Sequence, residues 1–288
     1  MEGDLAALTW LGTAGFRIEV AGCVLLIDPY LSRPAYARPR LPLTLSDMGP
    51  IDAIFLSHGH FDHALDAPRV AARSGAWVYA STDIVETLIR RGVPLDQAVA
   101  IDGEGEGSVG PIAFQAFPAG HVTFDLPLIV RTFLRCVRDR VDWSSLFSLW
   151  RRWPSGRPLA WRLSWPNGKR SSLSILHIGS AGATEAQLSR LAAVGRPDWL
   201  LFPLQGHSQI HQIGLRALKR LKPRVVIPHH HDDFYPPLSQ CIDISPFEKS
   251  VRGLSFPVHV IAPSIGERIP LGCLSRGEGI GYNSPREP

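Results

Sequence analysis

Short apolar segments separated by glycine-containing turns run through most of the chain, and their length and spacing predict strands. We predict strands over residues 8–11, 16–20, 24–27, 51–56, 77–80, 111–117, 159–165, 171–178, 198–202, 224–227, 256–261 and 267–271. Apolar residues at helical spacing predict helices over residues 64–72, 83–90, 184–193 and 210–221, with Thr184 as a candidate N-cap. Asn167-Gly168 between two predicted strands is typical of a hairpin. Opening hairpins followed by alternating strands and helices predict an α/β fold with two sheets between helices.

Residues 125–160 interrupt this pattern and are predicted to form a helical insert. Apolar residues recur there at helical spacing, and a second short helix follows with Asp142 as its candidate cap. Residues 131–170 hold ten arginines or lysines against two aspartates, an excess of +8, and five of the eight tryptophans. The insert is therefore both amphipathic and strongly basic.

Three interpretations of this insert stay open. It forms a lid or side wall of the functional site, because arginine with tryptophan suits a lipid headgroup interface or stacked nucleic-acid bases. It is a helical hairpin that buries its tryptophans on the sandwich and leaves its arginines in solvent. It is a contact between two copies of the chain, which would then form a homo-oligomer.

Composition sets the remaining expectations for the chain as a whole. Its 288 residues are 45% hydrophobic, enough for one α/β domain over residues 1–274, followed by a loose tail over residues 275–288. We expect no transmembrane helix and no secretory signal. The four cysteines form no CxxC pair and are predicted to be reduced thiols in a cytoplasmic protein.

The candidate chemistry is concentrated in the segment Ser57-His58-Gly59-His60-Phe61-Asp62-His63. Four metal-binding side chains, His58, His60, Asp62 and His63, follow the predicted strand over residues 51–56. The segment is therefore predicted to be a loop at the end of a strand, where a rigid scaffold aims the side chains. Imidazole nitrogens with a carboxylate suit zinc, with manganese or iron as alternatives, better than calcium or magnesium.

The pattern His-x-His-x-Asp-His resembles the signature of the metallo-β-lactamase superfamily, whose members have a four-layer αββα sandwich. The resemblance implies a third histidine after a later strand, and His121 in Pro118-Ala-Gly-His121 stands at that place. It also implies a last histidine in a Pro-x-His-x-x-x-Phe context, which selects His230, with His229 and His231 as alternatives. One metal ion would then be held by His58, His60 and His121, and a second by Asp62, His63 and His230.

The sequence departs from the family pattern at one ligand. The family has an aspartate that bridges both metal ions, and here Ser180 stands in its place. A serine hydroxyl is a poor zinc ligand, so either the site holds one ion or the second ion recruits another ligand. The candidates for that ligand are His177, His207 and Asp232. Loss of a carboxylate also makes the site more positive, which favours an anionic substrate.

Two further residues receive candidate roles, Asp28 from the resemblance and His207 from its position in the chain. Asp28, which ends the third predicted strand, is expected to accept a hydrogen bond from a ligand imidazole and so orient it. The alternative for Asp28 is a plain turn aspartate. His207 follows a strand on the side of the expected site, and we interpret it as a residue that contacts substrate or shuttles a proton, with a surface histidine as the alternative.

The resemblance implies a metal-dependent hydrolase in which a metal-bound hydroxide attacks a phosphodiester, a lactone or a related ester, with Asp62 helping to orient the nucleophile. Within the superfamily the chain looks most like the branch of L-ascorbate-6-phosphate lactonase and N-acyl-phosphatidylethanolamine phospholipase D. We expect an anionic or lipid-like small substrate and consider peripheral membrane contact through the insert. Two alternatives are a nuclease of the same superfamily, with nucleic acid as a less favoured partner, and a non-catalytic metal-binding scaffold.

Overall fold

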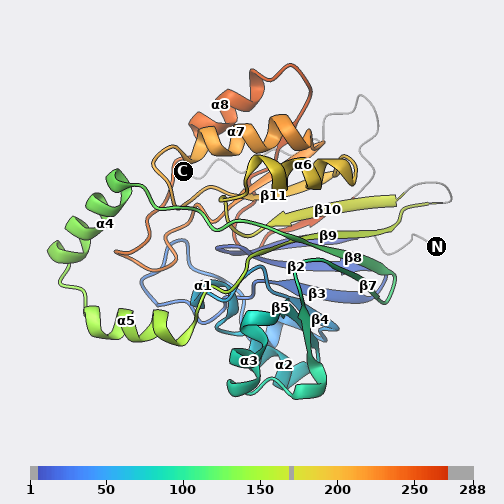
Figure 1. Cartoon of the computed structure of the whole chain (residues 1–288), viewed down its shortest axis with the longest axis horizontal. Coiled ribbons are helices and arrows are strands. Elements are labelled where there is room, and N and C mark those ends of the chain that lie inside the picture. Colours follow the sequence, from blue (N-terminus) through green and yellow to red (C-terminus); the bar gives the residue numbers. More distant parts are fainter. Residues whose placement is uncertain (1–5, 169–171, 272–288) are drawn as a thin grey trace.

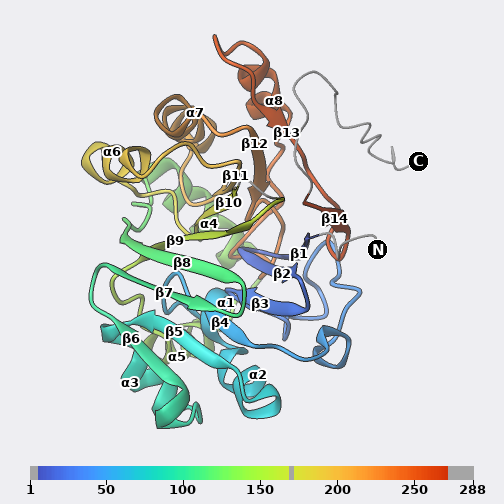
Figure 2. The ribbon, with the colours of Figure 1, turned by 90° about the vertical axis from the view of Figure 1, so that its right-hand side faces the viewer.

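Two seven-stranded sheets lie face to face and carry helices on their outer surfaces (Figures 1 and 2). The computed structural model describes residues 6–168 and 172–271. In Figure 1, α6, α7 and α8 cover one sheet, while α2 and α3 cover the other. The α/β class and the four-layer αββα sandwich predicted from the sequence are confirmed.

The first sheet combines hairpins with parallel crossovers, in the order β14-β1-β2-β3-β4-β5-β6. Its strands are β1 (Ala7–Gly12), β2 (Gly15–Val20), β3 (Cys23–Ile27), β4 (Ala53–Phe55), β5 (Trp77–Ser81), β6 (Ala98–Ile101) and β14 (Arg268–Pro270). Strands β1 to β3 pair antiparallel, and β3 to β6 pair parallel. Helices α1 (Phe61–Ala64), α2 (Ala67–Ser74) and α3 (Thr82–Arg90) lie in the crossovers.

The second sheet has the order β13-β12-β11-β10-β9-β8-β7. Its strands are β7 (Gly105–Val109), β8 (Ile112–Pro118), β9 (Leu159–Pro166), β10 (Ser172–Ile178), β11 (Trp199–Pro203), β12 (Val225–His229) and β13 (His259–Val260). Strands β10 to β13 run parallel, connected through α6 (Glu185–Ala193), α7 (Ile210–Leu221) and α8 (Ser245–Arg252). Short 3-10 turns occupy Leu45–Met48 and Leu95–Gln97.

Large aromatic side chains fill the space between the two sheets. Trp10 and Phe16 from the first sheet are buried together with Trp161 and Trp165 from the second. Two of the tryptophans in the basic window thus belong to β9 and to the core. The tryptophan enrichment of that window is therefore partly a property of a core strand and not of the insert.

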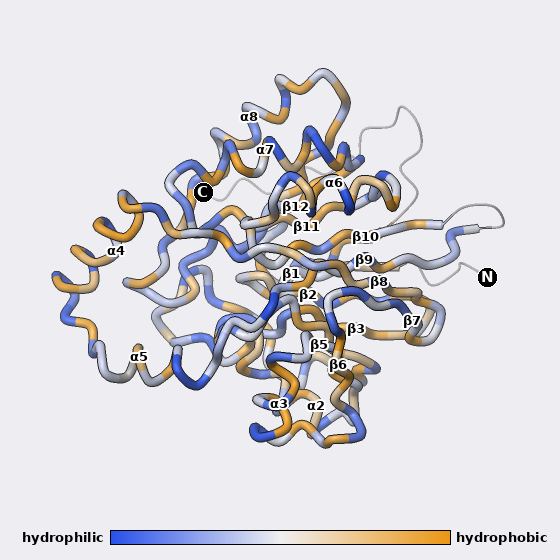
Figure 3. The backbone as a smooth tube through the Cα atoms, viewed as in Figure 1, coloured by the Kyte–Doolittle hydropathy of each residue, from blue (hydrophilic) through white to orange (hydrophobic). Residues whose placement is uncertain are grey.

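The insert consists of two helices, α4 (Leu126–Arg138) and α5 (Trp143–Arg152), that extend away from the sandwich (Figure 1). Figure 3 shows hydrophobic and hydrophilic positions along α4. The predicted helical region of about 125–160 was too long, because the helices end at Arg152 and β9 begins at Leu159. Asp142 accepts a hydrogen bond from the backbone N–H of Ser144 at 3.0 Å, near the start of α5.

Several predicted elements are confirmed and a few were wrong in extent. Thr184 caps α6, and the predicted hairpin is the antiparallel pair β9–β10. The helix predicted over 64–72 is split into α1 and α2, and the strand predicted over 256–261 is limited to His259–Val260. Strands β6 and β7 and helix α8 were not predicted. The tail at 275–288 and Cys273 lie outside the described residues, and Cys23, Cys136 and Cys241 are free thiols.

Within residues 6–168 and 172–271, no helix is long and apolar enough to span a membrane.

Candidate metal centre

The candidate ligands meet at one edge of the sandwich because each follows the carboxyl end of a strand. His58 and His60 follow β4, and Asp62 and His63 lie in α1 directly behind them. From the opposite sheet, His121 follows β8 and His230 follows β12. Loops at the carboxyl ends of parallel strands lie at the same edge, so residues 170 positions apart in sequence become neighbours.

Three histidines, His58, His60 and His121, form the first group of candidate ligands. Their ligating atoms lie within 4.8 Å of one another. His121 Nε2 lies 3.2 Å from His60 Nδ1, so these two nitrogens face each other. His58 is buried, whereas His60 and His121 are half-buried and open the group towards solvent. The predicted set of residues is thus brought together in space.

Asp62, His63 and His230 form the second group, also with ligating atoms within 4.8 Å of one another. The Oδ2 atom of Asp62 lies 3.3 Å from His230 Nε2 and 3.6 Å from His63 Nε2. The rings of His58 and His63 lie 3.8 Å apart between centroids, which places the two groups side by side. Both groups therefore belong to one site.

Hydrogen bonds to the ring nitrogens that face away from the site determine which nitrogen each histidine offers to a metal ion. Asp28, which is fully buried, accepts a hydrogen bond from His63 Nδ1 at 2.8 Å and also one from the backbone N–H of Ser57 at 2.7 Å. A carboxylate can only accept, so Nδ1 of His63 carries the proton and Nε2 keeps its lone pair for the site. The Ser57 hydroxyl donates to Asp28 and lies 3.0 Å from His58 Nδ1, so it orients His58 as well.

Gln205 orients the ring of His230 in the same way. Its Oε1 accepts a hydrogen bond from His230 Nδ1 at 2.9 Å, which leaves Nε2 of His230 facing Asp62. Gln205 follows the buried strand β11, and it was not among the predicted site residues. The only signal in the sequence is a polar side chain directly after a buried strand. Ser57 was likewise missed, although it begins the histidine motif.

Backbone conformation also aims the ligands. His230 has φ of 58°, an uncommon conformation for a residue with a side chain, and its N–H donates to Thr13 O at 2.8 Å. Gly59 separates His58 from His60, and a Cβ there would lie 2.2 Å from the carbonyl oxygen of Pro154. Only glycine permits this close approach, so the histidine loop can pack directly against the segment that follows α5.

Burial and neighbouring charge set different protonation states in the two groups. Burial lowers the pKa of His60 to about 4 and lowers the pKa of His58 and His121 as well. Burial alone would raise the pKa of Asp62, but the charge of His63 and the hydrogen bond with His230 outweigh burial and lower the pKa below its usual range. Burial opposes a charge on His63, but Asp62 and Asp28 raise its pKa. At neutral pH the first group therefore offers neutral imidazoles and the second an ionised carboxylate.

The Ser180 side chain contacts the backbone next to His121, a member of the first group. The side chain of Ser180 is buried, and its hydroxyl oxygen accepts a hydrogen bond from the N–H of Val122 at 2.9 Å. Val122 follows His121 directly, so Ser180 fixes the segment that carries this ligand.

None of the suggested replacement ligands joins either group within residues 6–168 and 172–271. Asp232 is buried and accepts two 3.0 Å hydrogen bonds from the N–H of Thr13, and it also pairs with Arg33. His177 is fully buried under the site, where its Nε2 lies 3.2 Å from Ala14 O. His207 accepts a hydrogen bond from the N–H of Gln209 at 3.0 Å.

The two neighbours of His230 point away from the centre. His229 is fully buried and its ring stacks on that of His177, with centroids 5.2 Å apart. His231 packs against Trp10 at 4.8 Å. His230 follows the end of β12 with a positive φ, and its ring is the one of the three that faces Asp62.

The chemistry of this donor set fits a first-row divalent metal ion. Six side chains supply five imidazole nitrogens and one carboxylate, and within each group the ligating atoms lie within 4.8 Å of one another. Ligands whose far nitrogens are hydrogen-bonded to Asp28, Gln205 and a backbone carbonyl are typical of metal-binding histidines. His58, His60 and His121 could hold one ion, and Asp62, His63 and His230 a second.

Comparison with known proteins agrees with this centre. The family model described as the beta-lactamase superfamily domain matches residues 7–230. A UPF0173 metal-dependent hydrolase from Myxococcus xanthus is 30% identical over 232 residues, covering 79% of this chain and 71% of the relative. A second UPF0173 metal-dependent hydrolase, from Polynucleobacter asymbioticus, is 27% identical and covers 91% of this chain and 85% of its own length.

Solved structures with the same fold include Igni18, a metallo hydrolase from the archaeon Ignicoccus hospitalis. It superimposes with a TM-score of 0.66 at 23% identity and covers 92% of this chain and 98% of its own. An isothiocyanate hydrolase from Delia radicum gut bacteria has a TM-score of 0.62 at 15% identity, with 92% and 99% covered. These likenesses show the fold. Together with the family model they establish that the chain belongs to the beta-lactamase superfamily and is a metal-dependent hydrolase with the metallo-β-lactamase fold.

Proposed function

We propose that this hydrolase acts on an anionic ester, a phosphodiester or a lactone with a negatively charged substituent, and that the substrate carries an apolar portion. The observation that carries the proposal is the donor set of the centre. Asp62 is the one carboxylate among six converging donors of the described residues, and Ser180 stands where a second carboxylate would be expected. A divalent ion held there is only partly neutralised, and this favours a negatively charged substrate group.

Residues of the chain have separate roles in the proposed reaction. A bound divalent ion supplies Lewis acidity and lowers the pKa of water towards about 7. Asp62 provides a carboxylate that stays ionised, since its pKa lies below its usual range, and it can therefore hold a cation or orient a water molecule. His121 and His60 are half-buried at the open side of the site, where the substrate would approach. Asp28, Ser57 and Gln205 keep the imidazoles in a single orientation.

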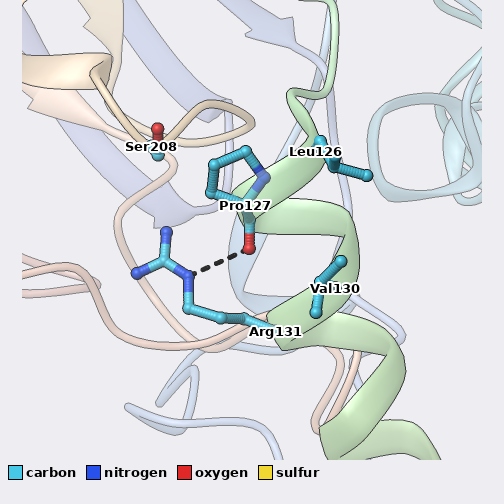
Figure 4. Close-up of a pocket in the computed structure, with 5 residues that line it drawn as sticks. All are labelled: Leu126, Pro127, Val130, Arg131 and Ser208. Carbon is cyan, nitrogen blue, oxygen red and sulfur yellow. Dashed lines mark hydrogen bonds between the residues drawn. The ribbon is translucent and has the colours of Figure 1, made fainter.

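A pocket at the start of α4, a few residues after His121 along the chain, supports an apolar portion of the substrate. It has a volume of about 580 Å³ and is lined by Leu126, Pro127, Val130, Arg131 and Ser208 (Figure 4). The Arg131 guanidinium group lies along one wall and donates from Nε to Pro127 O at 3.2 Å. Four residues separate His121 from Leu126 along the chain, so the pocket begins within about 18 Å of His121. Apolar walls with one cation suit an amphiphilic anion.

The proposal is tested by comparing esters that differ in charge and in apolar length. We expect bis(para-nitrophenyl) phosphate and an anionic long-chain ester to be hydrolysed faster than a neutral short-chain ester, in the presence of added zinc or manganese. His60→Ala should remove metal from the first group and abolish turnover, whereas His259→Ala, at an exposed position on β13, should leave both unchanged. A clear preference for neutral substrates would contradict the proposal.

A further inference from the structure

The insert exposes more large apolar side chains than any other part of the described chain. Nine residues of α4 and α5 are between 45% and 71% exposed: Leu126, Ile129, Val130, Phe133, Leu134, Val137, Trp143, Phe147 and Trp150. Only Cys136 of α4 and Leu146 of α5 are buried hydrophobic residues there. Trp143 and Trp150 are exposed, which contradicts the interpretation that the hairpin buries these tryptophans on the sandwich, whereas Trp153 directly after α5 is buried. A contiguous apolar surface of this kind marks an interaction site.

The exposed side chains form one continuous stripe. At about 100° per residue, the six exposed apolar positions of α4 span an arc of roughly 140°. Those of α5 recur at spacings of four and three residues, from Trp143 through Phe147 to Trp150. The rings of Phe133 and Trp143 lie 5.9 Å apart and join the stripe of α4 to that of α5. We call these nine residues the insert stripe.

The opposite side of the insert is fixed to the body of the protein. Arg135 donates hydrogen bonds to the side chain of Gln240 and, at 3.5 Å, to the carbonyl of Leu238. After α5, Trp153 is buried, and the Arg91 guanidinium lies 4.8 Å from its ring centroid. These anchors hold the two helices in one orientation, so the stripe is presented outward.

Positive charge accompanies the stripe. Residues 126–152 contain six arginines and two aspartates, a net charge of +4, which equals the net charge of the whole chain, so the remaining residues are balanced. On a helical projection Arg131 and Arg138 lie on one flank of the stripe in α4. Arg151 and Arg152 end α5 and are exposed. The surface is therefore both apolar and cationic, unlike the rest of the molecule.

We propose that the insert stripe docks the protein peripherally on an anionic lipid bilayer. Phenylalanine, tryptophan and aliphatic side chains would enter the boundary between headgroups and acyl chains, and the flanking arginines would contact the negatively charged headgroups. A second copy fits less well, because symmetric pairing of the stripe would bring two surfaces of net charge +4 together. The proposal concerns binding and does not depend on which substrate the metal centre hydrolyses.

Vesicle flotation with the full-length protein tests this proposal directly. We expect the protein to float with vesicles of equal parts phosphatidylcholine and phosphatidylglycerol, and to bind pure phosphatidylcholine vesicles much more weakly. Replacing both Arg151 and Arg152 with Gln should weaken binding to the anionic vesicles about 30-fold, since each arginine near a charged surface contributes about fivefold. The matched control, Arg69→Gln with Arg73→Gln on exposed positions of α2, should have no effect.

The apolar part of the stripe has its own matched pair of variants. Trp143→Ala and Phe147→Ser should each weaken vesicle binding roughly tenfold, whereas Trp77→Ala should not. Trp77 on β5 is 48% exposed and Trp143 is 47% exposed, so the two substitutions remove the same side chain at the same exposure. Thermal unfolding should be similar for all three variants, which separates a loss of binding from a loss of folding.

Two outcomes would overturn the proposal. One is the absence of binding to anionic vesicles. The other is a dimer, detected by light scattering, that dissociates in Phe147→Ser while vesicle binding does not change, because the stripe would then be an interface between two copies of the chain.

Discussion

Asp28→Asn offers a direct measure of how strongly the residues behind the ligands control the centre. The Asp28 carboxylate is fully buried and accepts hydrogen bonds from the backbone N–H of Ser57, from the Ser57 hydroxyl and from His63 Nδ1. An asparagine has nearly the same shape, but it has no charge and its NH₂ group cannot accept. His63 then loses the acceptor that fixes its tautomer. Loss of such a hydrogen-bond partner typically lowers metal affinity by about 10- to 100-fold, or about 1.4 to 2.7 kcal/mol.

The assay is a zinc titration of metal-free protein against a competing chelator, with stoichiometry from elemental analysis. We expect the affinity of the group containing His63 to fall by one to two orders of magnitude. Asp66→Asn is the matched control, because Asp66 is also buried and accepts three hydrogen bonds, from the N–H groups of Leu31 and Ser32 and from the Ser32 hydroxyl, but contacts no histidine. Both variants should lose stability, by about 1–3 kcal/mol. Equal zinc affinity in the two variants would refute the assigned role of Asp28.

Three further changes probe the same region. Ser180→Asp should raise zinc affinity about tenfold or more, because a carboxylate can both accept from Val122 N–H and reach the centre; unchanged stoichiometry and affinity in the titration would argue against the alignment of this segment. Gln205→Leu removes the acceptor of His230 Nδ1 and should weaken zinc binding by about tenfold. Burial lowers the pKa of His177 from 6.5 to about 4, so the unfolded chain binds more protons and stability falls as pH drops through this window. His177→Leu should reduce that fall, as measured by urea unfolding in chelator at each pH.

The sequence predicted the parts of the site that follow local rules. His58, His60, Asp62 and His63 are close in sequence, so a single loop brings them together once β4 is in place. The Pro-x-His-x-x-x-Phe context implied by the family resemblance separated His230 from its neighbours. These side chains could be named in advance because residue type, spacing and a preceding strand coincide.

Residues that act through tertiary contacts could not be identified in this way. Gln205 is a single glutamine after a strand, and its role depends on the distance between β11 and β12. Asp232 has the composition of a ligand, but Thr13 and Arg33, which are distant in sequence, bind its carboxylate instead. Hydrogen-bond competition between these partners and a metal ion leaves no mark on the local sequence.

The missed elements have a similar physical cause. The strand β7 has the sequence GEGSV, and three of its five residues are exposed, so it lacks the apolar alternation of a half-buried strand. Helix α8 buries only Phe247 and Val251 among eight residues. In the insert, periodicity predicted the helices but not which way their apolar face points, because a stripe towards the core and a stripe towards solvent have the same spacing.

The first strand described completes its pairing with the last one described. Strand β14 lies beside β1, with Ala7 opposite Pro270 and Thr9 opposite Arg268, and Ile269 is buried against the core. During synthesis, β1 emerges first, but its outer edge stays unpaired until residues 268–270 have left the ribosome. An N-terminal half made alone would expose that edge to other chains. The first sheet is thus expected to close only after β14 has been synthesised, and truncation just before β14 should favour aggregation.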